Sequence, residues 1–431
     1  MTLKPSNGCV IAAPQSGSGK TLVTLGLLRA LGRLGVQVKS AKVGPDYIDP
    51  AFHARASGSS CVNLDLWAMG EARVCHLAST HDYLLVEGVM GLFDGADNGY
   101  GSTADLAACL NLPVVMVVDA RSQSFSAAAL LHGFKSFRGD VDLAGVIFNR
   151  VGSERHAGLL RRAAEAVDVP VLGCLPRVEA LTMPSRHLGL VQAEEHGALE
   201  TLIEQAADLM AAHVDLEAIA AFQGGGFDAT GVKPLAPLGQ RIVLARDEAF
   251  SFTYAHMIDG WRAAGAEILP FSPLNNEAPD PSADAVFLSG GYPELHAGKL
   301  ASNAVFLDGL RALNGEALIY GECGGFMVMG DVLIDGDGVA HEMAGLLPVT
   351  TSFEQRTRHL GYRRLTHKSV LPWPETLRGH EFHYSTLIAQ GDDAALFMAE
   401  NAMGDVLDPM GLSMGKCVGS YAHVIAPEEG S

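Results

Sequence analysis

A single cysteine stands among glycines in the stretch from Tyr320 to Met327, which reads YGECGGFM. The pattern G-x-C-x-G, with Cys323 at its centre, is typical of a nucleophile elbow, a tight turn between a strand and a helix. Glycines relieve the steric clashes of such a turn, and the N–H groups of a helix start lower the pKa of a thiol. The pattern predicts a reactive thiol; the alternative is a cysteine packed as a small apolar side chain.

A cysteine nucleophile needs a base to take its proton and donors for the oxyanion that forms on the substrate. The late apolar run GSYAHVIA makes His423 the preferred base, and His380 and His383 are the other candidates. The turn LSGGYPE supplies glycines after another apolar run. We therefore expect the backbone N–H groups of Gly291 and Gly324 to form the oxyanion hole.

A second chemistry is indicated near the start of the sequence, in the stretch APQSGSGKTLVTLGLL. An apolar run precedes the glycines and an amphipathic pattern follows them, as in a phosphate-binding loop. In such a loop backbone N–H groups bind phosphate, the lysine neutralises the β- and γ-phosphates of ATP, and the threonine binds Mg²⁺. One position departs from G-x-x-x-x-G-K-[ST], because Pro14 stands where the first glycine belongs. The predicted nucleotide-binding residues are Gly17, Ser18, Gly19, Lys20 and Thr21.

Polar side chains follow several of the apolar runs in the same half of the chain. KVGPDYIDP contains Asp46 and Asp49, and DYLLVEGVMGLFDG contains Glu87 and Asp94. The carboxyl ends of parallel strands meet at one ligand crevice, where carboxylates complete the oxygen shell of Mg²⁺. Asn149 in FNRVG is expected to contact adenine, although asparagine at a strand end is also a common turn former.

Apolar runs that alternate with helix-like segments predict an α/β fold with two domains, each a largely parallel sheet with flanking helices. The expected domains are residues 1–221, which bind ATP, and 240–431, which carry the thiol, joined by a glycine-rich linker at 222–239. The expected strands of the first half lie within 8–14, 36–44, 82–88, 112–120 and 143–151. Those of the second half lie within 240–247, 266–271, 283–291, 316–323, 379–385 and 417–425.

The composition of the chain limits the class of protein and the partners that are expected. The 431 residues are 48% hydrophobic, enough for large cores, and no apolar run reaches the length of a membrane helix. The seven cysteines contain no C-x-x-C pair, and no signal peptide is recognised, which favours a soluble protein of the reducing cytoplasm. A net charge of −19 argues against a nucleic-acid partner, which requires a basic surface.

Several motifs carry a family resemblance. SGGYPE, YGECGGFM and SYAH resemble the class I glutamine amidotransferase domain, and the first half resembles the dethiobiotin-synthetase-like P-loop domain. Both halves together are similar to the cobyrinic acid and hydrogenobyrinic acid a,c-diamide synthases of corrinoid biosynthesis. The further motifs that carry this resemblance are KVGPDYIDPAFH, NLDLWAM, VEGVMGLFDG, RDEAFSFTY and GHEFHYS.

The resemblance implies that ATP activates the a and c acetate carboxylates of a corrin macrocycle as acyl phosphates, which ammonia from L-glutamine then converts to amides. It implies a Mg²⁺ site at Thr21, Asp46 and Glu87. The implied macrocycle contacts are Tyr47, Ile48 and Asp94. General class I enzymes carry His-x-Glu, whereas Ile425 stands two residues after His423. The resemblance therefore implies a Cys-His dyad whose orienting carboxylate is absent or replaced.

Alternatives remain open at this point. Hydrogenobyrinic acid is the favoured substrate, but a cobyrinic acid or nickel-sirohydrochlorin diamide synthase, or a cobyric acid synthase, has the same build. A nucleotide-regulated scaffold of the partition-ATPase type, with an inert amidotransferase-like domain, is the hypothesis from a different class. The oligomeric state is open, with a homodimer as one assembly.

Overall fold

The structure is a computed structural model that describes residues 7–178, 185–186, 189–190, 198–228, 232–391 and 393–429. The chain divides between Val232 and Lys233 into two compact units. This division lies inside the segment predicted as a linker, of which residues 229–231 lie outside the described residues. The predicted domain limits stay a prediction, and the two units are described separately.

The first unit is built on a seven-stranded sheet in the order β3-β2-β4-β1-β5-β6-β7, in which every neighbouring pair is parallel. Its central strands are almost continuous apolar runs because helices cover both faces of a parallel sheet. The strands are β1 (Gly8–Ala12), β2 (Val38–Val43), β3 (Val62–Leu64), β4 (Tyr83–Glu87), β5 (Val114–Asp119), β6 (Leu143–Val151) and β7 (Val171–Pro176). A short separate hairpin joins β8 (Ser185–Arg186) to β9 (Gly189–Leu190).

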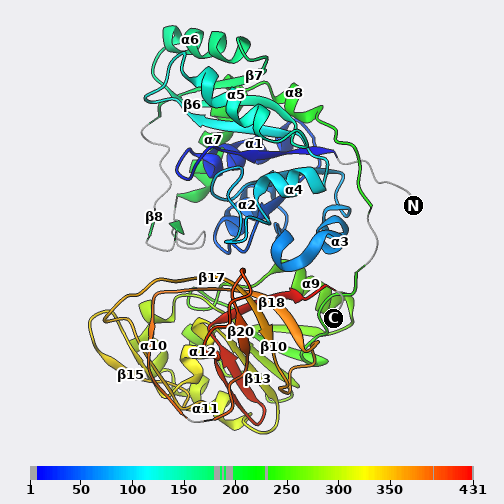
Figure 1. The fold of residues 1–431 in the computed structure, drawn as a ribbon. Helices are drawn as coiled ribbons and strands as arrows, with labels where there is room; N and C mark the ends of the chain where they lie inside the picture. The colour runs from blue at the N-terminus through cyan, green and yellow to red at the C-terminus, as the bar shows by residue number, and fades with distance from the viewer. Residues whose placement is uncertain are drawn as a thin grey trace. The chain divides into compact units, whose positions relative to one another are not determined.

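Eight helices of the described residues flank this sheet (Figure 1). They are α1 (Lys20–Arg33), α2 (Asp49–Ser57), α3 (Leu66–Ala78), α4 (Thr103–Cys109), α5 (Ala127–Phe137), α6 (Glu154–Glu165), α7 (Leu199–His213) and α8 (Leu216–Ala220). Side chains cap several of the helix starts; Ser102, for example, forms a capping box with Asp105 at the start of α4. Helix α1 packs against α2, α7 and α8.

Strand β1 lies between β4 and β5. Strands β2, β3 and β4 lie on one side of it, and β5, β6 and β7 lie on the other, so the strand order reverses at β1. Ligands of open α/β sheets bind at such a switch point, beyond the carboxyl ends of the strands. Two strands of this sheet, β3 and β7, were not predicted from the sequence.

The second unit contains a six-stranded sheet in the order β11-β10-β12-β13-β22-β21, in which only the last pair is antiparallel. Its strands are β10 (Arg241–Ala245), β11 (Glu267–Phe271), β12 (Ala285–Leu288), β13 (Leu318–Glu322), β21 (Leu412–Met414) and β22 (Cys417–Ser420). Its helices are α9 (Ala255–Ala263), α10 (Ala297–Ser302), α11 (Ala304–Ala312) and α12 (Gly324–Met329), with short 3₁₀ turns η2 (Pro273–Asn275) and η3 (Pro293–Leu295).

Two further four-stranded sheets complete this unit. One contains β14 (Val332–Ile334), β15 (Ala340–Glu342), β16 (Val349–Ser352) and β19 (Thr386–Gln390). The other is antiparallel and contains β17 (His359–Thr366), β18 (Thr376–His383), β20 (Met398–Glu400) and β23 (Ala422–Pro427). The α/β fold predicted for both halves is confirmed. Strands β18 and β23 overlap the segments 379–385 and 417–425 that were predicted as strands, whereas the other strands of these two sheets were not predicted. No helix among the described residues has the length and apolarity to cross a membrane.

Candidate functional site

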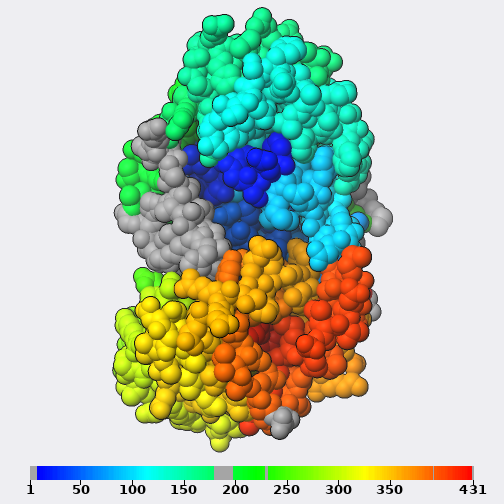
Figure 2. Space-filling model, turned by 60° about the vertical axis from the view of Figure 1, so that its left-hand side comes forward, coloured from blue at the N-terminus to red at the C-terminus, as the bar shows by residue number. Residues whose placement is uncertain are grey.

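The predicted phosphate loop connects β1 to α1 at the centre of the first sheet. Gly17 (φ 78°) and Gly19 (φ 96°) adopt the left-handed conformation, which lets the loop turn back over the start of α1. Residues 15–17 are exposed, and the dark-blue start of the chain is visible at the surface of the first unit in Figure 2. The loop therefore presents its backbone towards a ligand from solvent.

A cavity of about 800 Å³ opens beside this loop, and its lining includes Lys20 and Thr21. The Lys20 ammonium donates a hydrogen bond to the Met90 carbonyl at 2.6 Å. The Thr21 hydroxyl donates to Glu87 Oε1 at 2.7 Å. Burial lowers the pKa of Lys20 to about 8, although the Glu87 carboxylate opposes this shift. A bound phosphate would restore the lysine charge, which is the behaviour expected of a phosphate-binding lysine.

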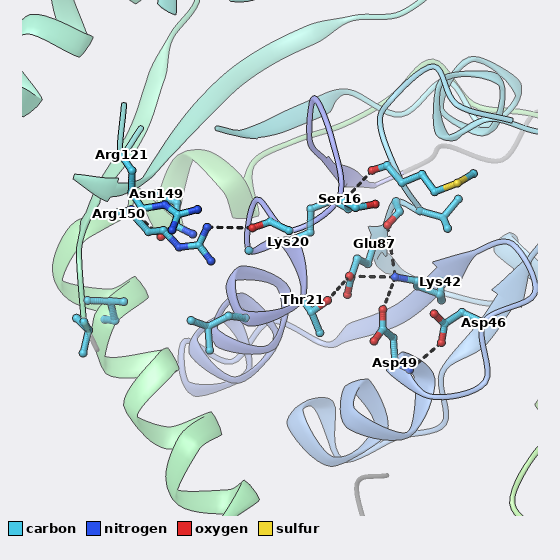
Figure 3. A pocket seen from close by; sticks show the side chains of 18 of the residues that line it. Ser16, Lys20, Thr21, Lys42, Asp46, Asp49, Glu87, Arg121, Asn149 and Arg150 are labelled. Atoms are coloured by element: carbon cyan, nitrogen blue, oxygen red, sulfur yellow. Dashed lines mark hydrogen bonds and ion pairs between the residues drawn. The ribbon is translucent and has the colours of Figure 1, made fainter. Parts of the chain in front are cut away.

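One wall of the cavity is a buried network around Glu87 (Figure 3). Its carboxylate lies 3.0 Å from Lys42 Nζ and 2.5 Å from His53 Nε2, and Lys42 also pairs with Asp49. Burial alone would raise the pKa of Glu87, but Lys42 and His53 hold it well below its usual range. Burial and the nearby carboxylate of Asp46 raise the pKa of Asp49 to about 7.

The opposite wall carries cations and an amide, contributed by residues after β5 and on β6 (Figure 3). Arg150 Nη1 contacts both the Gly17 carbonyl at 2.9 Å and the Asp119 carboxylate at 2.6 Å. Asn149 Nδ2 donates to the Ser18 carbonyl at 2.9 Å, so this amide braces the phosphate loop. Its predicted contact with adenine stays a prediction.

The predicted macrocycle contacts lie on the loops after β2 and β4. Asp46 Oδ1 accepts hydrogen bonds from the N–H groups of Ile48 and Asp49, which fixes the turn into α2. Ile48 is buried and Tyr47 is half-buried. Asp94 is exposed, and its Oδ2 accepts from the Gly91 N–H at 2.8 Å. Asp46 lines the cavity, whereas Tyr47, Ile48 and Asp94 are not among its lining residues.

In the second unit, Cys323 connects β13 to α12 with φ 48° and ψ −106°. A positive φ is rare for a residue with a side chain, and such strain persists only where the surroundings enforce it. The Cys323 N–H donates to the Ser420 carbonyl on neighbouring β22, which supplies part of that constraint. The conformation is that of a tight turn between strand and helix, as expected for an elbow, and Cys323 is only 3% exposed.

His423 on β23 lies next to Cys323, since a Cβ atom on Gly290 would lie 3.2 Å from His423 Nε2 and 3.3 Å from Cys323 Cβ. Burial would lower the pKa of His423, but Cys323 and Glu322 raise it to about 9. His383 lies 2.9 Å from Glu381 Oε1 and stacks on Tyr421. His380 is paired with His423 across β18 and β23; burial, followed by the charge of His423, lowers its pKa to about 3.

The predicted oxyanion donors lie beside the thiol. A Cβ atom placed on Gly324 would lie 3.1 Å from the Gly291 nitrogen, so the two residues are close neighbours. A Cβ atom on Gly290 would lie 2.4 Å from His423 Cε1 and 3.3 Å from Cys323 Cβ. A larger residue at Gly290 would therefore collide with the imidazole of His423 and press on Cys323. The turn after β12 thus leaves room beside the thiol because it carries no side chain at this position.

Sequence reasoning missed four residues of these sites, namely Lys42, His53, Arg150 and Glu322. Lys42 had a detectable signal, because it occupies a position in the run VQVKSAKVG that the sheet buries, and a buried lysine needs an anionic partner. His53, Arg150 and Glu322 depend on contacts between segments far apart in the chain, for which no local pattern exists.

Comparisons with known proteins agree with this division into two sites. Residues 9–191 match the CobQ/CobB/MinD/ParA nucleotide binding domain, and residues 241–430 match the CobB/CobQ-like glutamine amidotransferase domain. A Brucella anthropi protein named hydrogenobyrinate a,c-diamide synthase is 53% identical over 427 residues, covering 97% of this chain and 98% of the relative.

Proteins of the same name from Brucella suis and Rhizobium meliloti are similar to an equal extent. The first is 53% identical over 431 residues and covers 97% of this chain and 98% of its own. The second is 50% identical over 424 residues and covers 97% of this chain and 99% of its own. The chain therefore belongs to the a,c-diamide synthase family, glutamine-dependent amidating ligases that join a nucleotide-binding domain to a glutamine amidotransferase domain.

Proposed function

We propose that this enzyme amidates the a and c acetate carboxylates of hydrogenobyrinic acid in cobalamin biosynthesis, using ATP and the amide nitrogen of glutamine. The observation that carries the proposal is the presence, in one chain, of a phosphate loop beside a charged cavity and of a thiol elbow beside a histidine. The names of the relatives support the choice of macrocycle. A cytoplasmic location and a homodimeric assembly remain predictions.

In the first unit a carboxylate must become reactive towards ammonia, because a free carboxylate does not form an amide at neutral pH. Phosphorylation by ATP converts one carboxylate oxygen into a leaving group and gives an acyl phosphate. Lys20 and the loop N–H groups would hold the β- and γ-phosphates. Lys42 also lines the cavity and supplies a second cation. These donors stabilise the charge that develops on the transferred phosphoryl group.

The oxygen donors Thr21, Asp46 and Glu87 line the same cavity, and hard oxygen ligands of this kind suit Mg²⁺. These residues would hold the ion, which when bound neutralises charge on the phosphate oxygens. The hydrogen bond between Thr21 and Glu87 keeps two of the three donors together.

In the second unit Cys323 would attack the side-chain amide of glutamine while His423 takes the thiol proton and then delivers it to the leaving ammonia. The N–H groups of Gly291 and Gly324 would stabilise the oxyanion. Water then hydrolyses the γ-glutamyl thioester and regenerates the thiol. The freed ammonia reacts with the acyl phosphate and displaces phosphate.

The test uses the purified enzyme with ATP, Mg²⁺, glutamine labelled with ¹⁵N in its amide, and hydrogenobyrinic acid. We expect a diamide that carries two ¹⁵N atoms, detected by mass spectrometry. Cobyrinic acid and nickel-sirohydrochlorin are offered in parallel, and a higher kcat/KM with either one would change the assigned substrate. Nucleotide binding without an amidated product from any of the three would favour the scaffold hypothesis.

A further inference from the structure

The carboxylate of Glu322 lies next to the imidazole of His423. The position two residues after that histidine, where general class I enzymes have a glutamate, is occupied by Ile425. Glu322 Oε2 lies 3.5 Å from His423 Nδ1. Both side chains are only 2% exposed. Glu322 immediately precedes Cys323 in sequence, so the nucleophile and this carboxylate come from the end of one strand. The position of the carboxylate is therefore fixed by the same backbone that fixes the thiol.

The two oxygens of Glu322 have different partners. Oε1 accepts hydrogen bonds from the Tyr320 hydroxyl at 2.7 Å and from the Val424 N–H at 3.0 Å. These two bonds hold the carboxylate against the strand that carries His423. Oε2 faces the imidazole, which directs Nδ1 towards Glu322 and leaves Nε2 on the side of Cys323.

A buried carboxylate is costly unless a cation pairs with it. Within the part of the chain that the structure describes, His423 is the only cationic side chain within 4 Å of the Glu322 oxygens. The groups that face His423 are Cys323, Glu322 and, from the neighbouring strand, His380. Of these three, Glu322 is the group that can stabilise a positive charge on the imidazole without taking part in the reaction with glutamine.

We propose that Glu322 is the positioning residue for His423 and replaces, from the residue before the nucleophile, the carboxylate that general class I enzymes place two residues after the histidine. This inference rests on the proposed function of Cys323 and His423. Nδ1–H of the imidazole donates to Glu322 Oε2, which fixes the ring, so that Nε2 is the nitrogen that takes and holds the thiol proton. The carboxylate stabilises the resulting imidazolium and is not itself protonated.

The pKa of His423, which Cys323 and Glu322 together raise to about 9 although burial lowers it, agrees with this assignment. Loss of the Glu322 charge should lower that pKa. A purely structural carboxylate would instead be replaceable by a neutral group of the same shape without any change in the titration of the histidine.

Glu322→Gln tests the role, because glutamine keeps the shape and an acceptor but removes the charge. Glu316→Gln is the matched control, since it makes the same change at an exposed glutamate that precedes the same strand. We expect Glu322→Gln to lower kcat for glutamine hydrolysis by about 10²–10⁴-fold. The pH profile of Cys323 alkylation by iodoacetamide, followed by mass spectrometry, should shift its limb near pH 9 to lower pH, because the pKa of His423 falls. Glu316→Gln should keep both properties.

Amidation with ammonium chloride, which bypasses the thiol, reports whether each variant is folded. A Glu322→Gln enzyme with normal kcat and an unshifted alkylation profile would overturn the positioning role and leave the proposed function intact. Retention of glutamine-dependent amidation by Cys323→Ala would instead refute the proposed function. If Glu322→Gln does not fold, Glu322→Asp decides: a lowered kcat with normal ammonium-dependent activity supports the role, and an unchanged kcat overturns it.

Discussion

The two sites lie at equivalent places in the two units, beyond the carboxyl ends of parallel strands, yet they are formed by different kinds of groups. The cavity of the first unit is lined by ionised side chains that neutralise one another, as Lys42 does between Asp49 and Glu87. The thiol site of the second unit is formed largely by backbone, with a strained Cys323 and with glycines packed against it.

This difference fits what each site is proposed to bind. A triphosphate and a carboxylate carry several negative charges, so a site for them would need cations whose charge is balanced until the ligands arrive. Glutamine hydrolysis develops one oxyanion, which N–H groups in a rigid turn stabilise at no cost in reorganisation. We therefore expect the first site to be sensitive to changes of charge and the second to added volume.

The largest effect is expected at the thiol. Cys323→Ala should reduce glutamine-dependent amidation by about 10⁴-fold or more, because no other group can form the thioester. Amidation with ammonium chloride should be largely retained. Cys417→Ala, which removes a buried cysteine of the neighbouring strand β22, is the control and should keep both activities. Loss of both activities in a folded Cys323→Ala enzyme would contradict the separation of the two sites.

Removal of one charge from the first site should stop both routes to the amide. We expect Lys20→Ala to lower amidation with glutamine and with ammonia alike, by about 10²–10³-fold, because charge on the transferred phosphoryl group is no longer neutralised. Basal glutamine hydrolysis should continue. Lys39→Ala, which alters a half-buried lysine on β2 that is not among the cavity-lining residues, is the matched control. Normal ammonia-dependent synthesis by Lys20→Ala would refute the role of the loop.

A single added methyl group tests the second site. The Cβ of Gly290→Ala would lie 2.4 Å from His423 Cε1, so the imidazole must move away from the thiol. We expect kcat for glutamine hydrolysis to fall by about 10²-fold, as for a misplaced catalytic group. Gly298→Ala, whose Cβ would make an ordinary 3.4 Å contact with His341, should be neutral. Equal rates for the two variants would show that volume at this turn is unimportant.

The smallest expected effect is the uptake of protons when ATP binds. Burial lowers the pKa of Lys20 to about 8 despite the nearby Glu87 carboxylate, and bound phosphate should raise it again. ATP binding should therefore take up protons above about pH 8 and not at about pH 6.5, where the lysine is already charged. Calorimetry in two buffers of different ionisation enthalpy measures this uptake. Lys20→Arg stays charged at both pH values, so it should bind without uptake; the same uptake in that variant would assign it to another group.

Local patterns made much of the fold predictable, and contacts between distant segments explain what was missed. The phosphate loop and the elbow were found because each occupies a few consecutive residues whose types are dictated by backbone geometry. Strand β3 was missed because Val62–Leu64 is too short to show a period. In the two additional sheets of the second unit, β18 and β23 overlap predicted strands; the other strands were missed because they are short or carry polar residues on exposed faces.

The sites themselves were predictable only in part. The structure places His423 beside Cys323, and both residues end or begin apolar runs next to glycine motifs; their catalytic roles stay a prediction. The network of Lys42, His53 and Glu87 was not, because it depends on the burial of two strands side by side, which periodicity does not reveal. Glu322 was visible in the motif, but its partner lies about a hundred residues away in the chain.

The most direct test of the division of labour follows oxygen from the macrocycle into phosphate. Hydrogenobyrinic acid labelled with ¹⁸O in its carboxylates is converted with unlabelled ATP and glutamine, and the inorganic phosphate is analysed by mass spectrometry. If the first site makes an acyl phosphate, each amide formed should release one phosphate that carries one ¹⁸O atom, because the carboxylate oxygen leaves with the phosphoryl group. Formation of the diamide with unlabelled phosphate would contradict activation by ATP and would reduce the first site to a nucleotide-dependent conformational signal.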